Sequence, residues 1–518
     1  MRPRQSRRSA NSNLRASGAP LGRKRAGPRP SGFGTGLPGC GTLQGRFEAG
    51  ALTDSRLHCF VRKVREMEKG LARSVHCNRG AALTLLLLAM AGGVARAQEF
   101  GGREKLRAHS AEFRREVIEV ADGVWVAVGF SDSNSILIAG DGGSIVIDTT
   151  SDVEDATRVR AEFAKLTSAP VRAIIYTHSH PDHTGGASVF AGDGKPEIIA
   201  HRLFVDRVPD VGRAGRDGGD QFGSTLPDAL FINAGTGLEF GRHPATNGYL
   251  PPTRTFSEER LELTIAGVRL HLIHTPGETR ENIAVWLPDR RVLLPGDDFY
   301  KAFPTLYAIR GARLRPIDQW ITSLGAMIEL GADSLAPGHT RPVLGRDSVR
   351  AALTAYRDGI KSVVDQTLEG MRKGERPDEL VQHVALPSAL AENPFLQEFY
   401  GTVAWSVRGI YSDYAGWFDG NPAKLFPLAE SERATRIIDL AGGREAVLAT
   451  SRRALAGKDF QWAAELADYV LAVDSAQVEA RRLKAAALSE LGERQISAIA
   501  RNYYLSAAQY LLKGLPPQ

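Results

Sequence analysis

The chain has 518 residues, 43% of them hydrophobic, and is long enough for more than one buried core, because a domain typically holds about 100–200 residues. Its formal net charge of +6 suggests an anionic partner such as nucleic acid. The first 97 residues, however, hold 18 Lys or Arg and only 4 Asp or Glu, so residues 98–518 carry a net charge of −8. We therefore expect no nucleic-acid partner for the main part of the chain.

The N-terminal segment ends in a pattern that is typical of a secretory signal peptide. Basic residues at positions 69–79 precede the apolar run 81–91, and the small-residue cleavage pattern Ala95-Arg96-Ala97 follows. The apolar run holds about 11 residues, whereas a membrane span needs about 20. We expect cleavage after Ala97 and a secreted or periplasmic protein without stable membrane insertion.

The start of translation is expected at Met67, because signal peptides are about 15–30 residues long. Residues 67–97 would then be the signal peptide and residues 1–66 a non-native or disordered leader, rich in Arg, Gly, Pro and Ser. The mature protein would have no disulfide and no cysteine metal ligand, because all cysteines precede the cleavage site: Cys40, Cys59 and Cys77.

Strand-like runs and turns alternate at the start of the mature chain. The runs at 116–121, 123–129, 134–140 and 144–150 predict an antiparallel meander, followed by a helix over 153–166 and a strand over 171–177. A second set of strands is predicted at 261–265, 268–274, 283–287 and 291–294, before a helix over 316–330. Two β-rich halves with flanking helices predict an α/β fold of the αβ/βα sandwich type.

Two regions depart from this pattern. Residues 210–256 are rich in glycine and long for a connection, so they form either a lid or substrate loop or a mobile surface loop. After Gly345 helix-forming residues dominate, which predicts a catalytic domain over 98–345 and a separate all-α domain over 346–512. Four aromatic residues of the helical region are expected in core or interface packing: Trp405, Tyr411, Trp417 and Phe418.

The sequence THSHPDHTGG at 177–186 follows the strand predicted at 171–177. His178 and His180 are two apart in an extended segment, so both imidazoles point to the same side and can share a metal ion. Asp182 and His183 project from the following turn and can hold a second ion. Histidine nitrogen and carboxylate oxygen are ordinary zinc ligands, and coordination lowers the pKa of water from about 16 to about 7, which makes hydroxide available. The motif predicts two zinc ions (Zn²⁺) per chain.

This motif resembles the metallo-β-lactamase superfamily, whose downstream ligands are usually a histidine, an aspartate and a second histidine. Here Glu278, in TPGET, stands where most members have the first of these, while Asp297, in LPGDD, and His339, in APGH, match the others. In having a glutamate at this position, the sequence resembles the alkyl sulfatase family. Four further stretches carry the same resemblance: LYAIRGA at 306–312, ENPFLQ at 392–397, FYGT at 399–402 and GWFDGNP at 416–422.

The resemblance covers about residues 116–512 and implies a hydrolase that cleaves alkyl sulfate esters to alcohol and sulfate, with a helical dimerisation domain and a homodimeric assembly. It implies one zinc ion held by His178, His180 and Glu278, another held by Asp182, His183 and His339, and Asp297 as the bridge. Asp182, Asp297 and Arg310 would be the catalytic residues. Arg310 would grip the sulfate, because its fork of donors suits a tetrahedral anion.

Several alternatives stay open at this point. Glu281 could replace the glutamate ligand, Asp298 could replace the bridging aspartate, and Arg310 could pair with a surface carboxylate. His271 and His274 are expected to be structural histidines, with extra metal ligation as the rival interpretation. The same site could also serve a lactone, β-lactam or thioester hydrolase, or a non-enzymatic binder of amphipathic anions.

Overall fold

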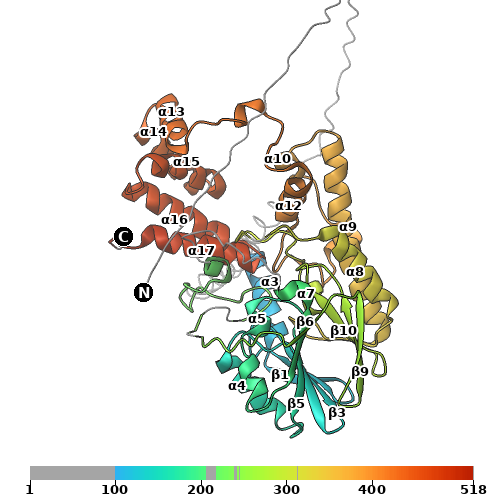
Figure 1. Ribbon diagram of the computed structural model, residues 1–518. Helices are drawn as coiled ribbons and strands as arrows, with labels where there is room; N and C mark the ends of the chain where they lie inside the picture. The colour runs from blue at the N-terminus through green and yellow to red at the C-terminus, as the bar shows by residue number, and fades with distance from the viewer. Residues whose placement is uncertain (1–99, 206–217, 239–241, 244, 312, 517–518) are drawn as a thin grey trace, which may run out of the picture. The chain divides into compact units, whose positions relative to one another are not determined.

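The structure is a computed structural model that describes residues 100–205, 218–238, 242–243, 245–311 and 313–516. The expected leader, signal peptide and cleavage site therefore lie outside the described residues. Figure 1 shows two β-sheets with helices on their outer faces, and further helices that follow them in the chain. No helix among the described residues combines the length and the apolar character that a membrane crossing requires.

The first sheet has seven strands in the order β1 to β7. It comprises β1 (Glu116–Ala121), β2 (Val124–Val128), β3 (Ser135–Gly140), β4 (Gly143–Ile147), β5 (Val171–Ile175), β6 (Glu197–His201) and β7 (Arg254–Phe256). Strands β1 to β4 are antiparallel, which confirms the predicted meander, and β4 to β7 pair in parallel. The β3–β4 hairpin turns at Asp141-Gly142, where Gly142 has a φ of 63° that a side chain would disfavour. Strands β6 and β7 were not predicted.

The second sheet has six strands in the order β13-β12-β11-β10-β9-β8. It comprises β8 (Arg260–Ile265), β9 (Val268–His274), β10 (Ile283–Leu287), β11 (Val292–Leu294), β12 (Ser334–Leu335) and β13 (Val343–Leu344). Branched apolar side chains from both sheets form one buried core between them, for example Ile145 and Ile147 against Leu270 and Val285. Burial of this layer away from water is the main force that holds the sheets face to face.

Helices cover the outer faces of both sheets. On the first sheet, Val146 and Ile174 pack with residues of α4 (Val153–Phe163) and α6 (Ala187–Ala191). On the second, Trp286 and Leu293 share a core with α8 (Ile317–Glu329) and α9 (Arg346–Arg372). The predicted αβ/βα sandwich is thereby confirmed. Because α9 packs on this half, the predicted boundary at residue 345 does not separate two hydrophobic cores.

The remaining helices form the all-α region that the sequence predicted. They are α10 (Pro377–Leu380), α11 (Ser388–Ala391), α12 (Val403–Ala415), α13 (Glu430–Leu440), α14 (Arg444–Ala456), α15 (Phe460–Val473), α16 (Val478–Glu493) and α17 (Ala498–Leu512). Trp405 and Tyr411 pack against hydrophobic cores as expected, whereas the side chain of Trp417 is 75% exposed, so within one chain the packing expected for it is not found.

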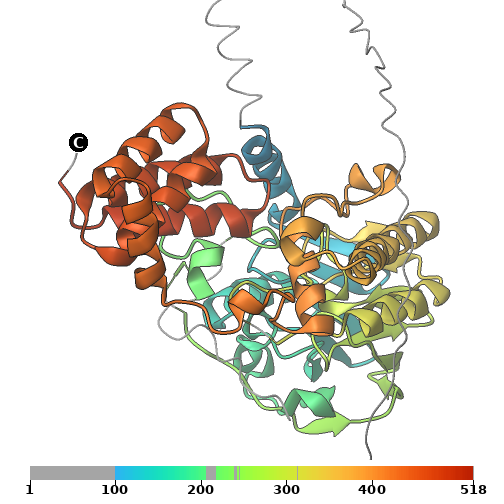
Figure 2. The ribbon, with the colours of Figure 1, turned by 90° about the horizontal axis from the view of Figure 1, so that it is seen from above.

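The described part of the long connection between the two halves packs against the C-terminal helix. The 3-10 turn η2 (Gly218–Phe222) lies beside α17 (Figure 2), and Asn502 of that helix donates to the carbonyl oxygen of Asn233 at 3.1 Å. Arg501 donates from Nη1 to the carbonyl oxygen of Leu230 at 2.5 Å. Residues 218–233 are therefore anchored to the helical region. The predicted role of 210–256 as a lid or substrate loop stays a prediction.

Acidification below pH 6.5 is expected to destabilise the fold through His109, the last residue of α3 (Gly101–His109). The ring is 5% exposed and stacks on Phe399 at 3.9 Å, and Nε2 donates to the carbonyl oxygen of Gly235 at 2.9 Å. Burial lowers the pKa of His109 from 6.5 to about 4. The unfolded chain therefore binds more protons between these pH values, and the free energy of unfolding falls by about 2–3 kcal/mol as pH drops from 7.5 to 4.5.

His109→Phe keeps a ring for the stack but removes the titrating group. We expect it to lower stability by about 1 kcal/mol at pH 7.5, where the hydrogen bond is lost, and to reduce the loss on acidification. Urea unfolding of chelator-treated wild type and variant at pH 7.5 and 4.5 measures both effects. An equal loss of stability on acidification in the two proteins would contradict this assignment.

Candidate metal centre

The histidine motif begins at Thr177, two positions after the last residue of β5, and enters the short helix α5 (Pro181–Thr184). Pro181 occupies the first position of that helix, where proline is favoured, and it keeps His180 extended, with φ −65° and ψ 143°. Gly185 allows the turn to approach the backbone before α4, since a Cβ there would lie 1.9 Å from the carbonyl oxygen of Ser151. The local sequence thus sets both the direction of the motif and its close packing.

The histidines and Asp297, in the 3-10 turn η3 (Gly296–Asp298), converge in one buried cluster. Nε2 of His178 lies 2.9 Å from Nδ1 of His180, and Nε2 of His183 lies 3.4 Å from Nε2 of His339. Oδ1 of Asp297 is 3.3 Å from His183, while its Oδ2 is 3.1 Å from His339 and 3.6 Å from His178. The two oxygens of Asp297 therefore reach histidines of both predicted ligand sets.

Three groups within this cluster have their ligand atoms within 4.8 Å of one another. They are His178, His183 and Asp297; Asp182, His183 and His339; and His180, Glu278 and Asp297. The structure thus brings together all seven side chains that the sequence and the resemblance nominate. One difference is that His178 and His183 fall in the same group, whereas the resemblance assigns them to different zinc ions. Their assignment as metal ligands stays a prediction.

The spacing and chemistry of the cluster fit metal ions. Ligands bonded at about 2.0–2.1 Å to a tetrahedral zinc ion lie about 3.3 Å apart, which is the separation that most of these atoms show. Oδ1 of Asp297 and Oε2 of Glu278 are buried without a hydrogen-bond partner. A buried carboxylate oxygen is costly to leave unpaired, and a cation would satisfy it.

Electrostatics within the cluster favour a bound cation. Although burial raises the pKa of Asp297, the nearby His183 and His339 hold it well below its usual range, so the carboxylate is ionised. Burial lowers the pKa of His339, but Asp297 and Asp182 more than reverse that effect and raise it. Because a metal ion binds the unprotonated imidazole nitrogen, metal ions and protons compete for these histidines, and metal affinity falls as pH falls.

Asp148, which the sequence analysis missed, holds the motif in place. Its Oδ2 accepts from Nδ1 of His183 at 2.8 Å and from Oγ1 of Thr177 at 2.7 Å, and its Oδ1 accepts from the backbone N–H of Thr177 at 2.8 Å. A carboxylate behind a ligating histidine fixes the orientation and the tautomer of the ring. An aspartate directly after the apolar run of β4, beside the strand that carries the motif, was the signal available in the sequence.

The structure separates Glu278 from its neighbouring alternatives. Oε1 of Glu281 accepts from Oγ of Ser179 at 2.5 Å, and Asp298 accepts the backbone N–H of Glu278 at 3.0 Å. Neither Glu281 nor Asp298 belongs to the three groups of the cluster. Glu278 itself forms an ion pair at 2.6 Å with Arg315, a residue that the sequence analysis did not single out.

Arg310 is half-buried near the cluster. Burial, His178 and then the positive charge of Arg310 lower the pKa of His180 well below its usual value. Within the described residues the side chain of Arg310 makes no hydrogen bond or ion pair. The surface ion pair considered as an alternative is therefore not seen, and the guanidinium is left for another anion.

His271 and His274 have structural surroundings. Arg260 donates to Nδ1 of His271 at 2.5 Å, and His274 stacks on His201 at 3.9 Å and donates to the carbonyl oxygen of Arg280 at 2.9 Å. Neither belongs to the three groups of the cluster. These contacts agree with the expectation that both are structural histidines.

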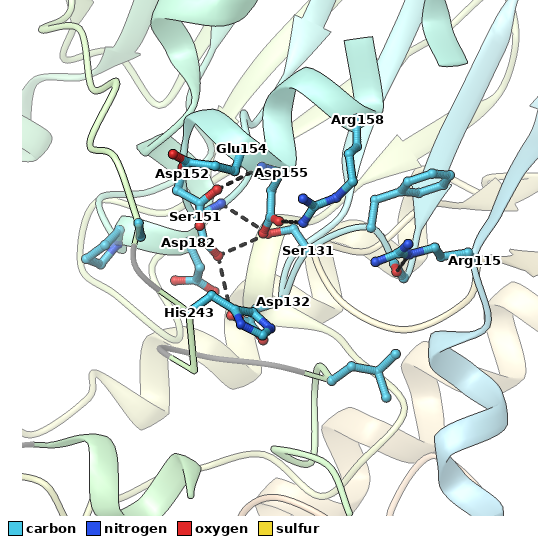
Figure 3. Close-up of a pocket in the computed structure, with 15 residues that line it drawn as sticks. Arg115, Ser131, Asp132, Ser151, Asp152, Glu154, Asp155, Arg158, Asp182 and His243 are labelled. Carbon is cyan, nitrogen blue, oxygen red and sulfur yellow. Dashed lines mark hydrogen bonds and ion pairs between the residues drawn. The ribbon is translucent and has the colours of Figure 1, made fainter. Parts of the chain in front are cut away.

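A pocket of about 310 Å³ lies on the Asp182 side of the cluster (Figure 3). Arg158 pairs with Asp155 there, and Arg115 donates to the carbonyl oxygen of Gly129 at 3.2 Å. Its lining includes five acidic residues: Asp132, Asp152, Glu154, Asp155 and Asp182. Because carboxylates outnumber cations here, this side of the cluster disfavours an anion.

Comparison with known proteins gives matches over both parts of the chain. Residues 128–339 match the family model of the metallo-beta-lactamase superfamily, and residues 376–514 match the model described as alkyl sulfatase dimerisation. The chain is 38% identical to a linear primary-alkylsulfatase of Pseudomonas sp. (strain ATCC 19151) over 71% of its own length and 72% of that protein. It is 31% identical to an (R)-specific secondary-alkylsulfatase of Pseudomonas sp., over 77% and 63% of the two chains.

The structural comparison agrees with these matches. The solved structure of a stereoselective inverting sec-alkylsulfatase from Pseudomonas sp. superposes with a TM-score of 0.71 at 30% identity, covering 78% of this chain and 66% of that one. The chain therefore spans slightly less than two thirds of that structure and of the secondary-alkylsulfatase. The matching domains, the identity to the primary-alkylsulfatase and the shared architecture together show that this chain belongs to the alkyl sulfatase family of the metallo-β-lactamase superfamily.

Proposed function

We propose that this protein hydrolyses alkyl sulfate esters to an alcohol and inorganic sulfate with the help of two zinc ions. The observation that carries the proposal is Arg310, a half-buried guanidinium without a partner among the described residues, beside a cluster of metal-binding type. Family membership supports the substrate class, since the matched relatives are named as alkylsulfatases.

Two zinc ions would be held as the resemblance implies, one by His178, His180 and Glu278 and one by Asp182, His183 and His339, with Asp297 between them. When bound, they would lower the pKa of water from about 16 to about 7, so that a nucleophile is available at neutral pH. The protein supplies the orientation: Asp148 fixes His183, the carbonyl oxygen of Asp132 accepts from Nδ1 of His339 at 2.8 Å, and burial keeps bulk water away.

Charge determines which side of the centre receives the sulfate. The carboxylates of Asp182, Glu278 and Asp297 offset three of the four positive charges of two Zn²⁺ ions. Arg315 is already paired with Glu278, so a cation that is unpaired among the described residues, such as Arg310, is the group that remains to bind an anionic substrate. The pocket beside Asp182 has an excess of acidic residues, whereas Arg310 lies on the His180 side. The sulfate group therefore binds on the His180 side, where Arg310 donates to its oxygens and stabilises the charge that develops on the departing sulfate.

Release of inorganic sulfate from dodecyl sulfate by zinc-loaded protein tests the proposal. We expect turnover by the wild type and none by His178→Ala, which removes a buried member of the cluster. A panel of lactone, β-lactam and thioester substrates is assayed in parallel. If dodecyl and shorter alkyl sulfates stay intact while a member of that panel is cleaved, the substrate assignment is wrong.

Arg310→Met is expected to raise KM for dodecyl sulfate about 10–100-fold, because a hydrogen bond to a charged group is worth about 1.5–3 kcal/mol. Zinc content should not change, since Arg310 is no member of the cluster. The matched control is Arg313→Met, an exposed arginine close by in the chain, which should leave KM within about twofold. Equal effects of the two substitutions on KM would contradict sulfate binding by Arg310.

We also propose that the protein is an exported homodimer. The match of residues 376–514 to the alkyl sulfatase dimerisation model supports the dimer, and the signal pattern before Gln98 supports export. Static light scattering of the purified protein should give twice the mass of the mature chain. Intact mass of the natural protein should place its first residue at Gln98; a mass that includes residues before Met67 would contradict the expected start of translation.

A further inference from the structure

Arg315 is a buried arginine next to the metal cluster, between the loop of Arg310 and helix α8. Its Nη2 lies 2.6 Å from Oε1 of Glu278, and the side chains of Arg315 and Glu278 are 4% and 3% exposed. Its guanidinium lies 5.9 Å from the ring of Trp320, whose indole N–H donates to the carbonyl oxygen of Asp298 at 3.0 Å. The arginine is thus held between the cluster and the core of the second sheet.

A fully buried ion pair is seldom explained by stability alone. Removing two charges from water costs several kcal/mol per ion, and an apolar pair of similar volume is often no less stable. Nη1 of Arg315 is in addition buried without a hydrogen-bond partner, which adds to the cost. The pair therefore calls for a role in the site.

The two carboxylate oxygens of Glu278 have different surroundings. Its Oε1 is taken by Arg315, while its Oε2 is buried without a hydrogen-bond partner, and one of its oxygens lies within 4.8 Å of the ligand atoms of His180 and Asp297. A glutamate side chain loses up to about 2 kcal/mol of rotamer entropy when it is fixed. A glutamate ligand therefore needs an anchor, and the guanidinium supplies one at Oε1.

We propose that Arg315 is a positioning residue that fixes the carboxylate of Glu278, so that its free oxygen faces His180 and Asp297 and completes one of the two metal positions. The same guanidinium offsets the negative charge of Glu278 beside Asp297 and Asp298. This role rests on the proposed two-metal function, but it concerns metal binding and needs no substrate to be tested.

Zinc affinity in a double-mutant cycle provides the test. Competition with a chromogenic chelator gives the affinity of each zinc ion in the wild type, Arg315→Met, Glu278→Gln and the double variant. Arg315→Met is expected to lower the affinity for one zinc ion about 10–100-fold and to leave the affinity for the other within about threefold of the wild type. If Arg315 acts through Glu278, adding Arg315→Met to Glu278→Gln should change zinc affinity by less than about threefold.

Two further variants keep the result interpretable. Arg310→Met removes the neighbouring guanidinium and should bind both zinc ions with wild-type affinity. Arg315→Lys keeps the charge without the planar fork and should restore part of the lost affinity, so it replaces the methionine variant if that variant fails to fold by circular dichroism.

The proposal would be overturned if Arg315→Met and Arg315→Lys both bound the two zinc ions with undiminished affinity. Additive effects of the two substitutions in the cycle, or a wild type that binds no zinc, would also overturn it. A wild type that binds zinc and shows the expected cycle, yet leaves alkyl sulfates intact, would overturn the proposed function alone.

Discussion

Asp297→Asn is expected to lower kcat/KM for dodecyl sulfate by at least about 10³-fold and to reduce zinc content below two ions per chain. A factor of 10³ corresponds to about 4 kcal/mol of transition-state stabilisation. Asp297 reaches His183 with Oδ1 and both His339 and His178 with Oδ2, at 3.1–3.6 Å. An asparagine presents one oxygen and one amide donor there, so one side of the cluster would face an N–H group that cannot bind a cation.

Asp298→Asn is the matched control, because it makes the same chemical change one residue further along. Asp298 accepts the backbone N–H of Glu278 and lies outside the three groups of the cluster, and an amide oxygen can accept the same bond. We expect two zinc ions and a loss of activity below about tenfold. Elemental analysis and sulfate release measure both variants. A larger loss in Asp298→Asn than in Asp297→Asn would instead identify Asp298 as the bridge.

The sequence predicts side-chain directions best for residues that are close together in the chain. Within the motif, the two-residue spacing and Pro181 determine the direction of His178 and His180, so local geometry is sufficient. The strands that were predicted in both halves combine β-branched side chains with a turn, as in Ile145 of β4 after Gly142, whereas β6, β7, β12 and β13 were not predicted. The distant candidates Glu278, Asp297 and His339 could be nominated only through the resemblance, because they lie in loops of the second sheet, which packs against the sheet that carries the motif.

The missed residues act through tertiary contacts. Asp148 and Arg315 carry no motif of their own; they matter because β4 pairs with β5 and because the segment before α8 reaches Glu278. Strand β7 has only three residues, too few for an alternating pattern. Helix α9 shows the opposite case. Its composition resembles that of the helical region, which is why the domain boundary was predicted at residue 345, but its apolar face packs on the second sheet.

Asp148→Asn is expected to lower the affinity for the zinc ion assigned to His183 about 10–100-fold and to lower the free energy of unfolding by about 1–3 kcal/mol. Asp148 accepts three hydrogen bonds, from Nδ1 of His183 and from the N–H and hydroxyl of Thr177. An asparagine replaces one accepting oxygen by an N–H donor, which must then face a donor in a buried site. The backbone φ of 55° at Asp148 is tolerated by asparagine, so the substitution changes hydrogen bonding without adding backbone strain.

Thr177→Val separates the two expected effects of Asp148→Asn. It removes the hydroxyl that donates to Asp148 and lies 3.1 Å from Nδ1 of His178, but leaves the hydrogen bond between Asp148 and His183 in place. We expect lower stability in urea unfolding and an affinity for the zinc ion assigned to His183 within about threefold of the wild type, so that any larger loss falls on the ion assigned to His178. If Thr177→Val weakened binding of the zinc ion assigned to His183 as much as Asp148→Asn, Asp148 would act through the fold of the β4–β5 edge and not through the imidazole of His183. A loss of zinc affinity confined to Asp148→Asn would show that orientation of one ring, by a carboxylate outside the cluster, sets the strength of that metal position.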